Sequence, residues 1–247
     1  MKTYTTIVKE AKDYDELSKH AAEHVINVVN KKPEATICIA GGDTPKGMIN
    51  NLVQAKKEGA VDFSQCQFIG LDEWVGLGEN DPGSCQHFLY HHLFKPLEIE
   101  REQIHVFDAR SEELNEECTK MNQLLDSLGG LDIVVLGIGV NGHVGFNEPE
   151  TGADWKAHVI RLDEKTLQVG QKYFDSSITP PKFGITLGMK QLLHSKEVVV
   201  IASGEKKLSA VQQLLYGEVS MEHPASILRY HPSLRVLVDQ HSFVKTL

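Results

Sequence analysis

A glycine-rich stretch near the middle of the chain, GIGVNGHVGFNEP at 137–149, holds side chains able to move protons. It carries His143, with Asn141 just before it and Glu148 just after it. An imidazole titrates near neutral pH, and a nearby carboxylate can orient it and hold one tautomer. We therefore expect acid–base chemistry at His143, although a lone histidine in such a loop also fits a structural role.

Two adjacent carboxylates, Asp72 and Glu73, directly follow the apolar run CQFIGL at 66–71. Partial burial at the end of a strand would raise the pKa of such a carboxyl group and let it accept or donate a proton near neutral pH. A helix N-cap or a structural ion pair would explain the same residues. Position alone leaves both interpretations open.

Two further segments could hold an anion. GGDTP at 41–45 stands before a predicted helix, where backbone amides and the helix N-terminus suit a phosphate. Lys206 and Lys207 follow Ser203-Gly204 at the end of another apolar run. The alternative without a ligand is a plain strand-to-helix turn for the first segment and a solvated helix start for the second. The GxGxxG pattern within 137–142 is not followed by a helix start, so we predict no dinucleotide site.

These groups sit at the ends of apolar, β-branched runs, which are typical of strands covered on both faces. We predict strands at 4–8, 35–42, 66–76, 105–108, 131–137, 197–204 and 235–239, and a strand passing into a helix over 185–193. We predict helices at 13–30, 44–55, 84–94 (N-cap Ser84), 111–128 (N-cap Ser111), 164–174 and 205–216. This alternation indicates one α/β domain over residues 1–247, with a doubly wound, mainly parallel sheet and helices on both faces. The polar region 150–183 is predicted to be a lid over the strand ends.

Composition narrows the function classes. The chain has 247 residues, 41% of them hydrophobic, and a net charge of -9, which argues against a nucleic-acid or anionic-membrane partner. Its four cysteines form no metal-binding pattern, and we expect no metal site. There is no apolar leader and no stretch of membrane-spanning length, so a cytoplasmic location is the default expectation. The Gly-x-Ser-x-Gly and HExxH motifs of hydrolases and zinc proteases are also missing.

Five segments together resemble one enzyme family. They are AGGDTP (40–45), LDEWVGL (71–77), LGIGVNGHVGFNEP (136–149), ITLGM (185–189) and the GxxK of 204–207. With them the chain resembles the glucosamine-6-phosphate deaminases, within the broader group that also holds the 6-phosphogluconolactonases. Lactonases typically have DER where this chain has Asp72-Glu73-Trp74, and a GHTASLFP-like segment where it has GHVGFNEP. The resemblance implies a modified Rossmann-like fold.

The resemblance also implies a reaction and its residues. An amino-hexose 6-phosphate would become a ketohexose 6-phosphate plus ammonia, without a metal or organic cofactor. Asp72 would move a proton from C2 to C1 through an enolamine, and His143 would open the sugar ring with support from Asn141 and Glu148. The predicted site comprises the catalytic residues Asp72, Asn141, His143 and Glu148 and the substrate-binding residues Gly41, Gly42, Asp43, Thr44, Glu73, Lys172 and Lys207.

The chain departs from the family pattern at several positions. Asn141 stands where many members have Asp, so a proton relay is lost there but hydrogen-bonded orientation of His143 is kept. Lys172 stands where members of the family commonly have Arg. Its ammonium offers a point charge instead of the planar guanidinium that binds an anion through two hydrogen bonds. His158 and Ile160 replace basic residues of allosterically regulated members, so activation by an N-acetylated sugar phosphate is not expected.

Three alternatives stay open at this point. The chain is also similar to relatives assigned to galactosamine 6-phosphate, through its segments LDEWVG, PGSC and VNGHVGFNEP. We rank the glucosamine epimer first as the substrate, on family frequency alone. A lactone hydrolase and a non-catalytic sugar-phosphate sensor are the other two. The only partner predicted is the small-molecule substrate, and the sequence does not predict whether the protein is a monomer or a homo-oligomer.

Overall fold

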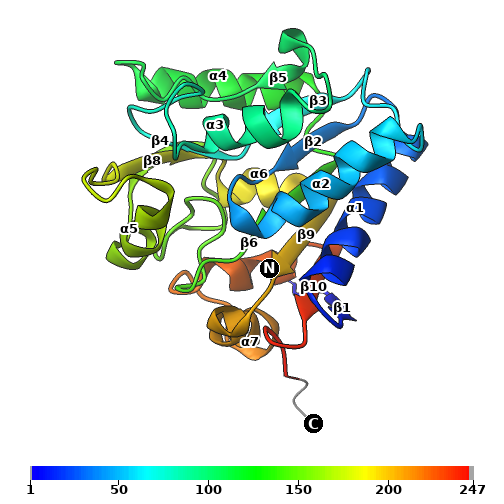
Figure 1. The fold of residues 1–247 in the computed structure, drawn as a ribbon. Coiled ribbons are helices and arrows are strands. Elements are labelled where there is room, and N and C mark those ends of the chain that lie inside the picture. Colours follow the sequence, from blue (N-terminus) through cyan, green and yellow to red (C-terminus); the bar gives the residue numbers. More distant parts are fainter. Residues whose placement is uncertain (1, 245–247) are drawn as a thin grey trace.

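A seven-stranded sheet forms the centre of the computed structural model, which describes residues 2–244 (Figure 1). Its order is β1-β10-β9-β6-β2-β3-β5, and every neighbouring pair is parallel. The strands are β1 (Ile7–Ala11), β2 (Thr36–Ile39), β3 (Gln67–Gly70), β5 (Ile104–His105), β6 (Ile133–Gly137), β9 (Glu197–Ala202) and β10 (Leu234–Asp239). The predicted α/β fold with a mainly parallel, doubly wound sheet is confirmed.

The central strands have no polar face because both sides of the sheet are covered. In β6, Val134 and Leu136 pack into one hydrophobic core, while Ile133 and Val135 pack into the other. All four side chains are fully buried. The continuous apolar run in the sequence follows from this arrangement, since side chains alternate between the two faces of a strand.

Helices lie on both faces of the sheet, as predicted. The core on one face includes side chains from α1 (Tyr14–Lys31), α2 (Asp43–Lys57), α3 (Cys85–Leu89) and the π-helix Tyr90–Phe94 that continues α3. The core on the other face includes side chains from α4 (Leu114–Ser127), α6 (Met189–His194), α7 (Leu208–Tyr216) and the 3-10 helix Pro224–Tyr230. Figure 1 shows α1 and α2 side by side over the first face.

A second, smaller sheet replaces the end of one predicted strand. The run 66–76 was predicted as a single strand, but the chain leaves the parallel sheet at Leu71. It then forms β4 (Asp72–Trp74), which pairs antiparallel with β8 (Phe183–Thr186), and β8 pairs antiparallel with β7 (His158–Arg161). Asp72 therefore lies at the junction between the two sheets.

The lid region, 150–183, is more regular than predicted. It contains β7, α5 (Glu164–Gly170) and the 3-10 helix Gln171–Tyr173, and the last two agree with the predicted helix 164–174. β7 was missed because its residues are only partly buried and show no apolar alternation. Within residues 2–244, no helix is both long enough and apolar enough to cross a membrane.

Two predicted boundaries were wrong. α4 begins at Leu114, and Ser111 lies outside it, where its hydroxyl accepts a hydrogen bond from the Glu113 amide at 3.1 Å. The first strand lies at 7–11 rather than at 4–8. By contrast, Ser84 is the N-cap of α3, as predicted, and accepts from the His87 amide at 2.9 Å. Two more 3-10 helices, Arg101–Gln103 and Glu205–Lys207, complete the described elements.

Candidate active site

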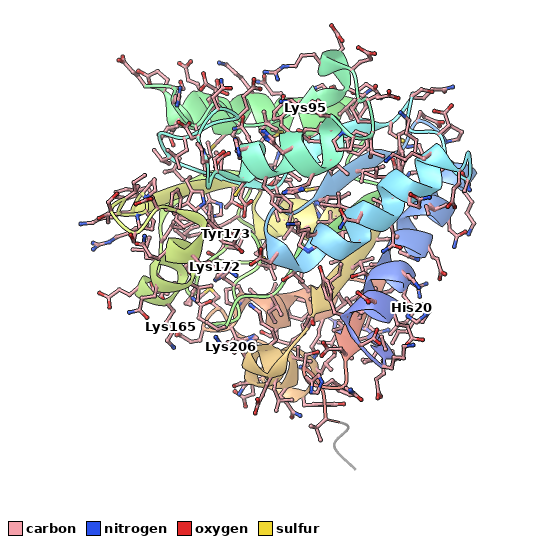
Figure 2. All side chains as sticks on the ribbon, viewed as in Figure 1. His20, Lys95, Lys165, Lys172, Tyr173 and Lys206 are labelled. Carbon is pink, nitrogen blue, oxygen red and sulfur yellow. The ribbon has the colours of Figure 1, made fainter. Side chains whose placement is uncertain are left out.

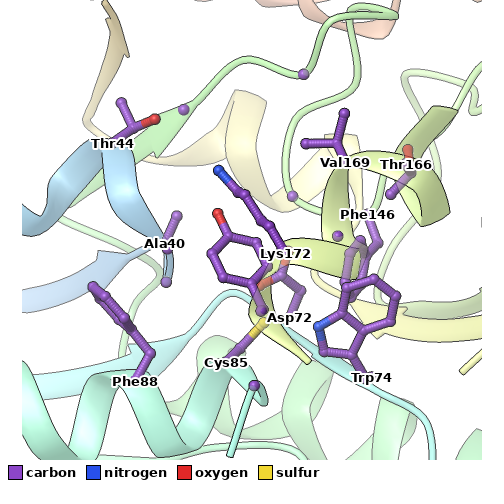
Figure 3. A pocket seen from close by; sticks show the side chains of 18 of the residues that line it. Ala40, Thr44, Asp72, Trp74, Cys85, Phe88, Phe146, Thr166, Val169 and Lys172 are labelled. Carbon is purple, nitrogen blue, oxygen red and sulfur yellow. The ribbon is translucent and has the colours of Figure 1, made fainter. Parts of the chain in front are cut away.

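The strand order reverses between β2 and β6, and a cavity of about 480 Å³ lies at the carboxyl ends of these two strands. From β2 the chain steps outward to β3 and β5, then returns to β6 on the other side of β2 before it reaches β9 and β10. Loops that follow two such neighbouring strands diverge, which leaves room for a ligand. The loop after β2, the loop after β6, β4, α3 and α5 all contribute to the cavity wall (Figure 3).

One end of the cavity suits an anion. Gly41, Gly42 and Thr44 line it where α2 begins. The N-cap of α2 is Gly42, which has no side chain to satisfy the first amides of this long helix and whose φ of 98° favours glycine. Free amides and the positive end of the helix dipole both attract a phosphate.

Lysines surround the same end of the cavity. The Nζ of Lys207 donates to the Ile138 carbonyl at 2.7 Å, and burial lowers the pKa of this lysine, with nearby Lys172 lowering it further. Lys172 reaches from the lid region and pairs with the Asp43 carboxylate at 2.6 Å. Lys165 also lines the cavity. Figure 2 shows Lys165, Lys172 and Lys206 on one side of the molecule, so a chain of net charge -9 presents cations where an anionic ligand would enter.

Asp72 lies in the same cavity, beside the Cys85 side chain (Figure 3). Burial raises the pKa of its carboxyl group to about 7, although a hydrogen bond from the Cys85 thiol opposes this rise. Burial and the adjacent Asp72 and Glu73 raise the pKa of the Cys85 thiol well above its usual value, so the thiol stays protonated and remains a donor. A carboxyl group with a pKa near 7 can both take and return a proton at neutral pH.

Glu73 does not line the cavity, so the geometry does not support a substrate-binding role for it. Its carboxylate is completely buried and accepts from the amides of Trp74, Cys85 and Gln86 at 2.8, 3.0 and 2.8 Å. Burial raises its pKa to about 7, while these three amide hydrogen bonds lower it. Glu73 thus fixes the start of α3, and with it the position of Cys85.

His143 is held by a chain of hydrogen bonds that runs away from the cavity. Its Nδ1 lies 2.7 Å from Asn141 Oδ1, and Asn141 Nδ2 donates to Glu148 Oε2 at 3.0 Å. Because a carboxylate accepts hydrogen bonds, Glu148 determines which end of the amide faces the imidazole. Nδ1 then carries the hydrogen, and Nε2 keeps a free lone pair.

The loop around His143 requires a glycine beneath the ring. A Cβ at Gly139 would lie 2.3 Å from His143 Cε1, so any other residue would displace the imidazole. Burial lowers the pKa of His143, Glu148 and Asp163 raise it, and Lys207 lowers it. The imidazole is therefore neutral at pH 7 and can accept a proton through Nε2.

An apolar wall closes one side of the cavity. The Trp74 ring contacts Phe146 edge-on with 5.0 Å between ring centroids, and Phe174 with 5.4 Å. Only 3% of Trp74 is exposed. Such a wall excludes water from that side of the cavity, where it strengthens nearby electrostatic interactions.

The structure brings most of the predicted site residues together. Asp72, His143, Gly41, Gly42, Thr44, Lys172 and Lys207 line one cavity. Asn141 and Glu148 lie behind His143, and Asp43 lies outside the lining and pairs with Lys172. Among residues 2–244, no group of three or more histidine, cysteine, aspartate or glutamate side chains is arranged to hold a metal ion.

Several lining residues carried no signal in the sequence. Cys85 contacts Asp72 and Thr166 contacts His143, yet both lie outside the glycine-rich motifs. Tyr173 also lines the cavity, with its hydroxyl against Gly42. The sequence predicts Ser84 as a helix N-cap, which makes Cys85 the first residue of that helix. Placing this helix start at the end of the preceding strand would have brought Cys85 near Asp72.

Comparison with known proteins identifies relatives over nearly the whole chain. The model of the family described as glucosamine-6-phosphate isomerases/6-phosphogluconolactonase matches residues 9–237. The glucosamine-6-phosphate deaminase of Thermoanaerobacter pseudethanolicus is 36% identical over 230 residues, which cover 93% of this chain and 91% of that relative. The glucosamine-6-phosphate deaminase of Bacillus velezensis is 38% identical over 227 residues, with 92% and 94% covered.

Solved structures show the same likeness. A structure described as a monomeric glucosamine-6-phosphate deaminase of the NagB superfamily superposes with a TM-score of 0.93 at 35% identity, covering 96% of this chain and 98% of that one. The 6-phosphogluconolactonase of Trypanosoma brucei superposes with a TM-score of 0.78 at 18% identity, covering 97% and 98%. The second likeness shows a shared fold alone.

Proposed function

The chain belongs to the glucosamine-6-phosphate isomerase/6-phosphogluconolactonase family, and from this premise we propose that it deaminates an amino-hexose 6-phosphate, glucosamine 6-phosphate first among candidates. The products would be a ketohexose 6-phosphate and ammonia. One observation carries the proposal: Asp72 and His143 line the same cavity, and the anion-binding end of that cavity is built from α2 and Lys207.

The phosphate binds first in this proposal. The amides at the start of α2, the Thr44 hydroxyl and the Lys207 ammonium hold the dianion, and Lys172 adds a cation from the lid region. This anchors the sugar with its ring between Asp72 and His143. Fixing the phosphate at one end turns the later proton transfers into intramolecular steps, which lowers their entropic cost.

Ring opening falls to His143. Its Nε2 has a free lone pair and the residue lines the cavity, so the neutral imidazole takes the proton of the anomeric hydroxyl and returns one to the ring oxygen. Glu148, whose carboxylate lies 3.5 Å from Nδ1, stabilises the imidazolium formed between these two events. Asn141 orients the ring without taking a proton.

Isomerisation falls to Asp72. Its carboxylate takes the C2 proton of the open-chain aldose, which produces an enolamine, and the resulting carboxylic acid returns a proton to C1. The C2 nitrogen then forms an iminium that water hydrolyses to the ketone, with release of ammonia. A carboxyl group with a pKa of about 7 suits both halves of this transfer.

The test is an ammonia-release assay with glucosamine 6-phosphate and galactosamine 6-phosphate side by side. We expect one ammonia per ketohexose 6-phosphate formed, with the glucosamine epimer preferred and unphosphorylated glucosamine a poor substrate. A preference for the galactosamine epimer would keep the chemistry and change the substrate.

Two results would replace the proposal. Release of acid from a 6-phosphogluconolactone, with no ammonia from either amino sugar, would identify a lactone hydrolase in which His143 activates water. Calorimetric binding of both amino-sugar phosphates without ammonia release would identify a sugar-phosphate sensor.

A further inference from the structure

The lid region reaches the hydrogen-bond chain behind His143 as well as the mouth of the cavity. The Thr166 hydroxyl, on α5, lies 3.1 Å from His143 Nδ1. Thr166 is 5% exposed and lines the cavity (Figure 3). Among residues 2–244, this imidazole is the one side-chain hydrogen-bond partner of the Thr166 hydroxyl. The contact therefore joins the lid to a proton-moving group.

A second contact fixes α5 to the same chain. The backbone amide of Asp163 donates to Glu148 Oε1 at 3.3 Å, while the Asp163 carboxylate caps α5 by accepting from the Lys165 amide at 2.8 Å. Glu148 thus receives a hydrogen bond from Asn141 through one oxygen and from the lid through the other. The first turn of α5 is positioned by the groups that orient His143.

The geometry at Nδ1 defines what the Thr166 hydroxyl does. The single Nδ1 hydrogen points toward Asn141 Oδ1 at 2.7 Å, and the Thr166 oxygen at 3.1 Å can accept the same hydrogen as a second, longer branch. Both acceptors favour the tautomer with Nε2 free, and both stabilise the imidazolium. Because residue 141 is a neutral amide here, the hydroxyl and Glu148 contribute the remaining stabilisation.

We propose that Thr166 is a positioning residue whose hydroxyl shares the Nδ1 hydrogen of His143 with Asn141, so that ring opening is fast only while α5 covers the cavity. The inference rests on the proposed function. It deepens that function by assigning the lid a role in the proton-transfer step in addition to closing the site. Lys172 lies two residues after Gly170, the last residue of α5. Substrate binding at Lys172 would therefore favour the same position of the helix.

Charged groups from three segments face His143 and affect its titration. Glu148, on its own loop, and Asp163, before α5, raise its pKa, whereas Lys207, after β9, lowers it. These groups stay in place when the Thr166 hydroxyl alone is removed. A change in the titration of His143 after that removal would therefore report the hydroxyl.

The experiment compares Thr166→Val with Thr166→Ser in the full chain. Valine keeps the shape and loses the hydroxyl, and serine keeps the hydroxyl. Thr119→Val is the matched control, because within residues 2–244 the Thr119 hydroxyl bonds only to the Asn115 carbonyl of its own helix, α4. Steady-state ammonia release gives kcat and KM, and NMR gives the titration of the His143 ring, assigned with His143→Gln.

We expect Thr166→Val to lower kcat by about tenfold with KM changed less than about twofold, as for loss of one hydrogen bond to a group charged in the transition state. Its His143 should titrate at lower pH than in the wild type. Thr166→Ser should restore both properties, and Thr119→Val should match the wild type.

The inference would be overturned by equal impairment of the valine and serine variants, or by an unchanged kcat and an unchanged His143 titration in the valine variant. An increase in KM alone would also overturn it, by limiting the lid to substrate binding. If the wild type releases no ammonia, the proposed function fails, and the NMR comparison still decides whether Thr166 contacts His143 as inferred.

Discussion

The strand-end shelf, defined as Gly41–Thr44, Asp72 and Gly137–Glu148, and the lid region, 150–183, form two walls of one cavity. The groups of the shelf follow closely after β2, β3 and β6 of the main sheet, and Glu148 behind them is 3% exposed. The lid carries partly exposed groups, and half of the Lys172 side chain is open to solvent. In the proposed mechanism, the groups that move protons therefore belong to the buried wall, whereas the lid adds one contact that positions His143.

The largest effect expected from this division is at His143. His143→Gln removes the ring-opening group of the shelf, so we expect kcat to fall by roughly a hundredfold or more, the usual loss for a general acid–base. This exceeds the loss expected for Thr166→Val on the lid. Steady-state ammonia release measures both, and equal losses in the two variants would remove the distinction between the walls.

Two lysines sharpen the comparison at the phosphate. Lys207 is partly buried beside the shelf, so Lys207→Met should raise KM by about thirtyfold to a hundredfold, as for a charged hydrogen bond in a poorly solvated site. Lys172 is half exposed, and Lys172→Met should raise KM by about fivefold or less because solvent screens its charge. A larger effect at Lys172 would mean that the lid is the main phosphate-binding wall.

The pH dependence of kcat/KM should report the shelf carboxyl group. In the proposed mechanism Asp72 acts as a base and must be ionised, so kcat/KM should rise with pH with a midpoint at about 7 and level off above it. Cys85→Ala removes the thiol hydrogen bond that lowers this pKa, so the midpoint should move to higher pH, whereas Cys85→Ser should keep a donor. Thr166→Val should leave this midpoint in place. If the midpoint of the kcat/KM profile shifts in Thr166→Val and not in Cys85→Ala, the titrating group is not Asp72.

The smallest effect is expected at the contact between the two walls. Asp43 and Lys172 form an exposed ion pair at 2.6 Å, and such pairs contribute less than about 1 kcal/mol to the free energy of unfolding. Asp43→Asn should therefore change the urea midpoint only slightly, with Lys172→Met giving a similar change. A loss several times larger would show that this pair holds the lid against the shelf.

The shelf was predictable from the sequence because its physics is local. An apolar run such as IVVLG ends in glycines and polar groups, which predicts a buried strand followed by a binding loop, and His143, Asp72 and Gly42 were all found in this way. That residues 1–247 form a single domain stays a prediction, as do a cytoplasmic location and the assigned site roles.

The lid was harder to predict because its structure depends on distant partners. β7 becomes a strand only by pairing with β8, and β4 separates from β3 for the same reason. Thr166 lies in a polar segment, and its importance comes from lying 3.1 Å from a histidine that is 23 positions earlier. Glu73 shows the reverse case: the family resemblance implied a substrate contact, but alternation along β4 turns its side chain into the protein.

The central claim is that Asp72 moves the proton of a sugar held in this cavity, and Asp72→Asn tests it most directly. Asparagine keeps the size of the side chain and cannot take a proton. With ammonia release and calorimetric binding of a non-amino hexose 6-phosphate measured on the same preparation, we predict turnover reduced by about a thousandfold or more and affinity changed by less than about threefold. A variant that binds the sugar phosphate normally and still turns over at a near-normal rate would contradict the account.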